Sequence, residues 1–258
     1  MMKMYLFLPF ILIFSNSYAQ KLTDKFQYKV TYKLTYKLDS TALDEPKSEY
    51  MILYAGDKLS KFSSRAKTLS NPNVVQGNSG HTSREALTKF HYEILKEAQS
   101  GNLHYTLKIP KMDDTFYYIE EMDQFEWTIL PENKKIKDFK VQKATTSFAG
   151  RDYIAWFTPE IPIAEGPYKF NGLPGLILEI ADTKEQWVFE FFGLEKLSPK
   201  VSYKLNLNQF AKTDKEQLQD LWYRYRKDPF SYSNNPIIQT SLFHKRCTKN
   251  MWNLLLKC

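Results

Sequence analysis

Apolar and polar side chains alternate with a period of two along residues 26–38. The apolar positions run from Phe26 to Leu38, and the positions between them carry glutamine, lysine and threonine. Because successive side chains of a strand point to opposite faces, this pattern predicts a long strand with one buried face and one wet, basic face. Its length predicts a curved or strongly twisted antiparallel sheet.

Further strands are predicted along most of the remaining chain. Met51–Ala55 and Lys58–Ser63 flank Gly56-Asp57, a dipeptide typical of a hairpin turn. Segments of similar length recur between turn residues, at 103–109, 116–120, 125–130, 137–148, 153–158, 176–180 and 186–192. Turn signals at this spacing are typical of an antiparallel sheet.

Two segments carry helix signals. Thr82 and Glu85 form a capping box, and apolar residues at helical spacing follow from Leu87 to Ala98. A second box, Thr213 with Glu216, precedes a helix that Asp228-Pro229 ends. Residues 65–82 lack periodicity and are predicted to form a loop.

The expected architecture is a single mainly β domain over residues 20–258. It is a large curved antiparallel sheet, in the form of a half-barrel, with two short helices packed on or beside it. A closed β-barrel or a two-sheet sandwich is the structural alternative.

The first 19 residues predict export. A basic Lys3 precedes an apolar core from Tyr5 to Phe14, and Ser17-Tyr18-Ala19 forms a cleavage site. That core is too short to span a bilayer, and no cysteine follows it to carry a lipid anchor. We expect cleavage after Ala19, no later membrane span, and a periplasmic or cell-envelope location.

The formal net charge is +7, and removal of residues 1–19 takes away one lysine and no acid, which leaves +6. A basic exported protein suits an anionic envelope surface or an acidic ligand, whereas lysines dispersed over a solvated face are the plainer interpretation. Export argues against a nucleic-acid partner. The basic face of the first strand, Lys29, Lys33 and Lys37, either lines a groove for an acidic partner or protects a sheet edge.

Two cysteines stand near the C-terminus, Cys247 and Cys258. An oxidising compartment permits a disulfide between them. A helical tail would instead hold their Cα atoms too far apart to bridge. Both alternatives remain open, and nothing in the spacing indicates a redox or zinc motif.

A segment rich in proline and glycine precedes the strand at Leu176. Residues 159–175 hold four prolines and three glycines, and Pro174-Gly175 suits the central positions of a type II turn. We interpret this segment either as a covered corner that nucleates strand pairing or as a stiff rim for a ligand or partner. The contact residues of such a rim would be Trp156, Glu160, Tyr168 and Phe170.

These residues also carry a family resemblance. The chain resembles the GLPGLI family of exported bacterial proteins over residues 26–197, roughly, through spaced motifs that agree in order. The motifs are Trp127-Thr-Ile129, Lys143-Ala144-Thr145, Arg151-Asp-Tyr-Ile-Ala-Trp-Phe-Thr158, Glu160-Ile-Pro162, Gly166-Pro167 and Gly172-Leu173-Pro174-Gly175-Leu176-Ile177. The resemblance implies an envelope protein often encoded near TonB-dependent outer-membrane receptors. It implies no catalytic residues.

The sequence contains no motif of a metalloprotease, P-loop or serine hydrolase. Its four histidines are scattered along the chain. We therefore expect neither a metal nor a cofactor. Arg151-Asp152 either caps a turn or forms a polar anchor beside Trp156.

The leading hypothesis is a non-catalytic envelope protein that binds an outer-membrane receptor, a lipid or a glycan. A hydrolase with a site near Arg151, Asp152 and Glu160 is the alternative, and a structural assembly factor without a ligand is the third.

Overall fold

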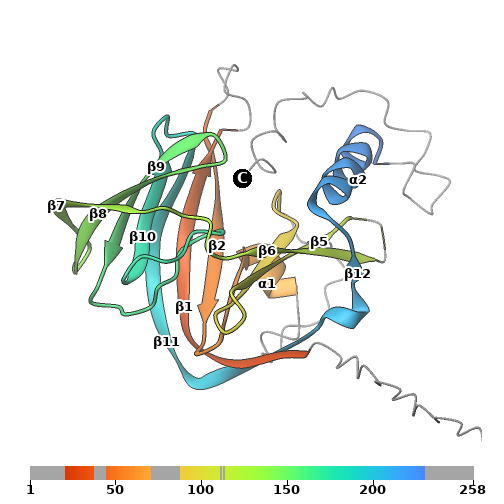
Figure 1. Cartoon of the computed structure of the whole chain (residues 1–258), viewed down its shortest axis with the longest axis horizontal. Helices are drawn as coiled ribbons and strands as arrows, with labels where there is room; N and C mark the ends of the chain where they lie inside the picture. Colours follow the sequence, from red (N-terminus) through yellow and green to blue (C-terminus); the bar gives the residue numbers. More distant parts are fainter. Residues whose placement is uncertain (1–20, 38–44, 71–87, 111, 113, 230–258) are drawn as a thin grey trace, which may run out of the picture.

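The computed structural model describes residues 21–37, 45–70, 88–110, 112 and 114–229. Its strands form one 12-stranded sheet in the order β12-β6-β5-β4-β3-β2-β1-β11-β10-β9-β8-β7 (Figure 1). The elements are β1 Lys21–Tyr36, β2 Lys47–Ala55, β3 Leu59–Ser64, α1 Arg65–Ser70, β4 Tyr92–Glu97, β5 Asn102–Lys108, β6 Thr115–Glu121, β7 Thr128–Ile136, β8 Phe139–Phe148, β9 Arg151–Thr158, β10 Leu176–Asp182, β11 Trp187–Asn206, the 3-10 turn η1 Leu207–Gln209, β12 Ala211–Lys212 and α2 Lys215–Lys227. The fold is the predicted large curved antiparallel sheet, with one parallel pair, β12 beside β6.

The alternating strand predicted from Phe26 is β1, and it lies in the middle of the sheet. It pairs with β2 on one side and β11 on the other. Val30, Tyr32 and Leu34 are fully buried, as their parity requires. Because β1 has a neighbour on each side, the lysines of its other face do not protect a sheet edge. Lys29 instead pairs with Glu195 on β11 at 2.9 Å.

The β1–β11 ribbon bends sharply near its lower end (Figure 1). Phe26 lies opposite Val201 and Tyr28 opposite Lys196, so β11 inserts residues 197–200 against the single residue 27 of β1. Beyond this bulge the ribbon packs on the second face of β2, β3, β4 and β6. Phe26 therefore joins a separate small core with Tyr54, and the single buried face predicted for β1 is interrupted there.

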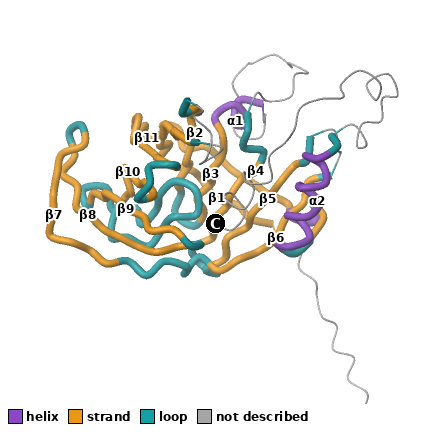
Figure 2. The backbone as a smooth tube through the Cα atoms, turned by 90° about the horizontal axis from the view of Figure 1, so that it is seen from above, coloured by secondary structure: helices purple, strands orange, loops and turns teal. Residues whose placement is uncertain are grey.

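The sheet is strongly curved (Figure 2), and the main core lies on its inner side. One end of the sheet is β7, and at the other end β6 lies beside the short last strand β12. β6 and β7 are consecutive in the chain and are joined by residues 122–127. The connection from β9 to β10, residues 159–175, lies within this curve and contributes Tyr168, Phe170 and Leu173 to the core. The predicted mainly β class with a large open sheet and two helices is thus confirmed.

The helices occupy different positions from those expected. The pattern at residues 87–98 predicts a helix, but Tyr92–Glu97 forms β4. Ile94 and Leu95 are both buried, one in the main core and the other in the small core. Because the adjacent Ile94 and Leu95 are both apolar, β4 lacks the strict alternation of a half-buried strand, and its apolar positions match helical spacing instead. The capping-box residues Thr82 and Glu85 lie outside the described residues.

The two helices among the described residues are short. α1 begins at Arg65, inside the segment predicted to be a loop. α2 is the second predicted helix, and its N-cap is Asp214, whose side chain accepts a hydrogen bond from the Gln217 amide at 2.7 Å. The capping box predicts Thr213 as the cap, so the helix begins one residue later than predicted. The apolar face of α2 is buried and consists of Leu218, Trp222 and Tyr225.

Several sequence predictions concern residues outside the described ranges. These are the export signal at residues 1–19 and the Cys247–Cys258 pair. Within the part of the chain that the structure describes, no helix has both the length and the apolar character needed to span a bilayer.

Candidate functional site

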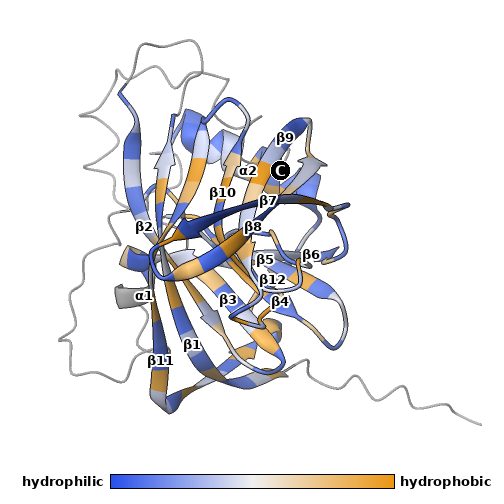
Figure 3. Cartoon of the chain, turned by 90° about the vertical axis from the view of Figure 1, so that its left-hand side faces the viewer, coloured by the Kyte–Doolittle hydropathy of each residue, from blue (hydrophilic) through white to orange (hydrophobic). Residues whose placement is uncertain are grey.

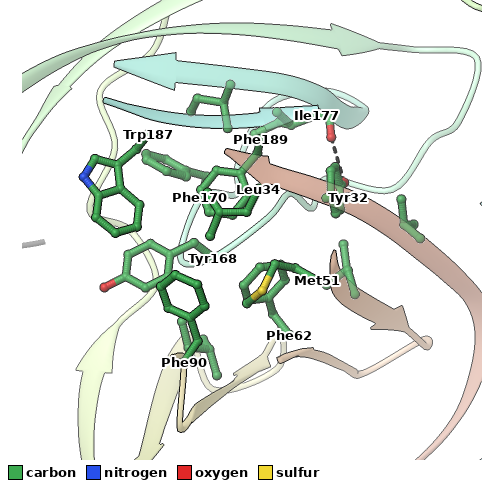
Figure 4. Close-up of a cluster of buried hydrophobic side chains, with 14 of the residues drawn as sticks. Tyr32, Leu34, Met51, Phe62, Phe90, Tyr168, Phe170, Ile177, Trp187 and Phe189 are labelled. Carbon is green, nitrogen blue, oxygen red and sulfur yellow. Dashed lines mark hydrogen bonds between the residues drawn. The ribbon is translucent and has the colours of Figure 1, made fainter. Parts of the chain in front are cut away.

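The Pro/Gly segment, residues 159–175, is an internal plug of the curved sheet. Apart from one bridge between Glu165 and Asn171 it makes no strand pairing, as its prolines predict. Tyr168 and Phe170 are 6% and 2% exposed, and they lie among the rings of Phe90, Trp187 and Phe189 (Figure 4). These two aromatics, predicted as rim contacts, are core residues because the plug turns them inward.

A buried lysine of β4 fastens one side of the plug. The Lys96 ammonium has no exposed side-chain surface and lies 2.6 Å from a carboxylate oxygen of Glu165. It also donates to the carbonyl oxygens of Gly166 at 3.1 Å and Phe170 at 2.9 Å. Burial lowers the pKa of Lys96, and the Glu165 carboxylate opposes that shift. One ammonium therefore gathers three acceptors of the plug.

A second buried lysine joins the plug to β6, the strand beside β12. Lys169 forms an ion pair with Glu120 of β6, and Lys215 of α2 lies 2.9 Å from the same carboxylate. Burial alone would raise the pKa of Glu120, but the two ammonium groups outweigh it and hold that pKa below its usual value. The Lys169 ammonium also lies within 5.6–5.9 Å of the ring centres of Tyr105, Tyr118 and Tyr168.

The end of the plug requires glycine. Gly175 has φ of +151°, and a Cβ placed there would lie 2.1 Å from the Thr158 carbonyl oxygen. The Gly175 amide donates to the Leu173 carbonyl at 2.7 Å, while the Leu176 amide donates to Ile161 at 3.0 Å. The predicted type II turn needs the Leu176 amide for its own closing bond, so a tighter turn around Pro174 replaces it.

The other motif residues pack closely between the plug and the neighbouring strands. A Cβ on Gly166 would lie 2.8 Å from the Ile177 side chain, and Pro167 beside it is buried. Leu173, Leu176 and Ile177 are at most 1% exposed. The Tyr32 hydroxyl donates to the Ile177 carbonyl at 2.8 Å, which ties the motif to β1 (Figure 4).

The predicted polar pair Arg151-Asp152 is divided between two contacts. Arg151 lies 2.7 Å from a carboxylate oxygen of Asp182, and the other oxygen accepts from the amides of Gln186 and Trp187, each at 2.7 Å. Arg151 thus braces the β10–β11 turn. Asp152 is exposed and accepts from the Ser147 hydroxyl at 2.5 Å.

Glu160 lies at the other end of β9 from this pair. It accepts from the Lys140 amide at 3.0 Å. Seven residue steps separate Arg151 from Thr158 along β9, which is about 23 Å of extended chain. The structure therefore does not bring Arg151, Asp152 and Glu160 to one site. Among the described residues, no three His, Cys, Asp or Glu side chains group in a way that could hold a metal ion.

Trp156 has a different setting, on the outer face of the sheet. Its cross-strand neighbours are Lys143 and Glu179, and the Lys134 ammonium lies 4.5 Å from its ring centre. Lys134 also pairs with Glu179. The ring is half-buried by these neighbours.

The same outer face continues on β11, β1 and β2. Lys33 lies opposite both Glu190 and Tyr50. Phe192, next but one to Glu190 on β11, is 53% exposed and meets the Tyr50 ring edge-on at 4.9 Å. We call this surface the outer band; its members are Trp156, Glu179, Glu190, Phe192, Lys33 and Tyr50. Figure 3 shows polar and apolar positions alternating along these strands.

Sequence reasoning missed the buried ion pairs and the exposed aromatic. Lys96 falls in the predicted helix, where a lysine is ordinarily solvated. Lys169 stands between two aromatics of the signature, which is the one local sign that it is enclosed. Glu165 and Glu120 have no local sign, since their partners are distant in the chain. Phe192 shares its strand parity with Glu190, which is the local sign that it faces outward.

Comparisons with known proteins agree with this description of the fold. A family described as "Protein of unknown function (Porph_ging)" matches residues 149–179, which cover β9, the plug and the first part of β10. No curated protein matches the chain.

Among solved structures, two of PNGF-II, in space groups P21 and C2, are similar at a TM-score of 0.55 each. Their sequence identity is 14% and 13%, and each match covers 78% of this chain. The matches cover 34% and 33% of the PNGF-II chains, so this chain spans about a third of their length. At this identity the likeness concerns the fold alone.

Proposed function

We propose that this protein is a non-catalytic binding or accessory protein of the bacterial cell envelope, of the GLPGLI type, exported by residues 1–19. Its partner is a protein of a TonB-dependent outer-membrane receptor system, and its contact surface is the outer band. The observation that carries this proposal is the exposure of Phe192, at 53%, on a sheet face where Tyr50 and Trp156 also lie.

The composition of the outer band supports a protein partner. Aromatic residues on a rigid scaffold supply contact area at low cost in conformational entropy, and they are enriched at binding hot spots. Charges of both signs surround them here, with Lys33 opposite Glu190 and Lys134 paired with Glu179. Such a mixed surface suits a folded protein with complementary charges better than it suits a purely apolar ligand.

The plug supports the same proposal from inside the sheet. Its buried lysine contacts fix β9 and β10 relative to β4 and β6, so the strands under the outer band are held in one arrangement. A preorganised surface loses little entropy when it binds. The hydrolase alternative requires Arg151, Asp152 and Glu160 to converge, and their separate contacts give it no support.

The test is mass spectrometry of material captured with the tagged protein from gently crosslinked native envelopes. Wild type is compared with Trp156→Ala/Phe192→Ala and with Tyr223→Ala, which truncates an aromatic of similar exposure on α2. We expect one receptor component to be enriched by wild type and Tyr223→Ala and lost with the double variant. Equal capture by all three proteins, or no specific capture by any of them, would remove the outer band as a binding surface.

A further inference from the structure

The bent end of the β1–β11 ribbon has two different faces. Leu22, Phe26 and Tyr203 point inward and belong to the small core. The alternate positions, which point outward, are Thr23 opposite Lys204 and Lys25 opposite Ser202. All four outward side chains are exposed, as is Lys200 in the adjoining bulge.

This outward face is basic and carries no acid. The one acidic residue in the paired segments 21–26 and 201–206 is Asp24. Its carboxylate is turned away, toward the β2–β3 turn, where it accepts from the amides of Lys58 at 2.8 Å and Leu59 at 2.9 Å. Asp57, the acidic residue of the β2–β3 turn, accepts a hydrogen bond from the Gln27 side chain.

The three lysines of this face stand without carboxylate partners. Lys25, Lys200 and Lys204 form no ion pair with any residue that the structure describes. This contrasts with Lys29, Lys61, Lys96 and Lys169, each of which faces a glutamate. The hydroxyl groups of Thr23 and Ser202 lie between the lysines and add hydrogen-bond donors to the same surface.

We propose that this face, which we call the basic ribbon face, docks the protein on a membrane surface of anionic phospholipid headgroups. It is an open face of paired strands rather than a cleft, so it fits an extended charged surface. Its cations are all lysines, whose compact charges suit diffuse attraction to headgroups rather than bidentate recognition of one ligand. It is also the place where the expected export segment joins the chain, at Lys21.

This inference rests on the proposed envelope location for the identity of the membrane, but its surface lies apart from the outer band. The test uses the full chain with vesicles of phosphatidylcholine containing phosphatidylglycerol, in a sedimentation assay. Each lysine near an anionic surface contributes a factor of about 5 to binding. Lys25→Glu/Lys200→Glu/Lys204→Glu should therefore weaken binding about 100-fold or more, and binding should disappear in 1 M salt, where the Debye length is about 3 Å.

The matched control changes net charge equally at three other exposed lysines, as Lys47→Glu/Lys135→Glu/Lys184→Glu. We expect this variant to retain most of its vesicle binding. Equal losses in the two triple variants would show attraction by net charge alone and overturn the assignment. Absence of vesicle binding at low salt would also overturn it, as would binding of the wild type to a soluble polyanion but not to vesicles. Vesicle binding requires no receptor, so failure of receptor capture and failure of this docking are separate results.

Discussion

Lys96, whose side chain is fully buried, forms an ion pair with the mostly buried Glu165 between the fourth strand and the plug, with 2.6 Å between ammonium and carboxylate. The two residues are separated by 69 positions in the chain. Because the same ammonium donates to two plug carbonyls, the plug is organised around a cation supplied by the protein itself.

Removal of that cation is expected to be costly. Lys96→Met leaves the Glu165 carboxylate and two carbonyl groups without their buried donor, and we expect a loss of about 3–5 kcal/mol in the free energy of unfolding. Urea denaturation measures it. Lys29→Met, which removes the half-exposed pair with Glu195, should cost no more than about 1 kcal/mol.

A second variant separates charge from packing at this site. Lys96→Met/Glu165→Gln removes both charges and should recover part of the loss of the single variant. If the double variant were no more stable than Lys96→Met, the cost would come from packing around the methionine and not from an unpaired carboxylate.

Gly175→Ala should destabilise the protein by several kcal/mol. The new Cβ would lie 2.1 Å from a backbone oxygen of Thr158, and a φ of +151° is strained for any L side chain. Gly101→Ala is the control, since φ is +69° there and a Cβ meets nothing within 4 Å. We expect it to cost about 1–2 kcal/mol. Similar unfolding midpoints for the two variants would contradict the close approach at Gly175.

Acid should weaken the fold through Glu93. Burial alone would raise its pKa, but Lys61 and Lys67 outweigh burial and lower the pKa from 4.5 to about 2. The stabilisation that this shift represents is complete above pH 4.5 and is lost as the pH falls toward 2. Unfolding free energy measured between pH 6 and pH 3 should decline, and Glu93→Gln should flatten that decline while lowering stability at pH 7. A decline of the same steepness in the variant would place the titrating group elsewhere.

Asp182→Ala should lower the melting temperature strongly. It removes the acceptor of two backbone amides and leaves Arg151, whose side chain is 16% exposed, without its carboxylate. We expect a loss of about 3–5 kcal/mol. Asp152→Ala removes an exposed carboxylate of the neighbouring strand and should cost less than about 1 kcal/mol. Thermal unfolding followed by circular dichroism compares them, and a small shift for Asp182→Ala would show that the turn holds without its brace.

The local part of the fold follows from the sequence. Alternation along β1, the hairpin at Gly56 and the proline-rich exclusion of residues 159–175 from the sheet all depend on near neighbours, and these predictions agree with the structure. The strand β4 does not follow, because Ile94 and Leu95 are buried on opposite faces and break the alternation, so the apolar positions satisfy a helical pattern equally well. Its second buried face exists only because the bent β1–β11 ribbon covers it.

The sequence by itself determined the mainly β class, the rigidity of the Pro/Gly segment and the need for glycine before Leu176, since period-two patterning and backbone sterics are local. Only the tertiary structure decided that this segment is an inner plug and that Tyr168 and Phe170 face the core. It also decided that Arg151 and Glu160 serve separate contacts. The physical reason is that burial and ion pairing depend on which distant strands become neighbours, and the curvature of a 12-stranded sheet sets those neighbours.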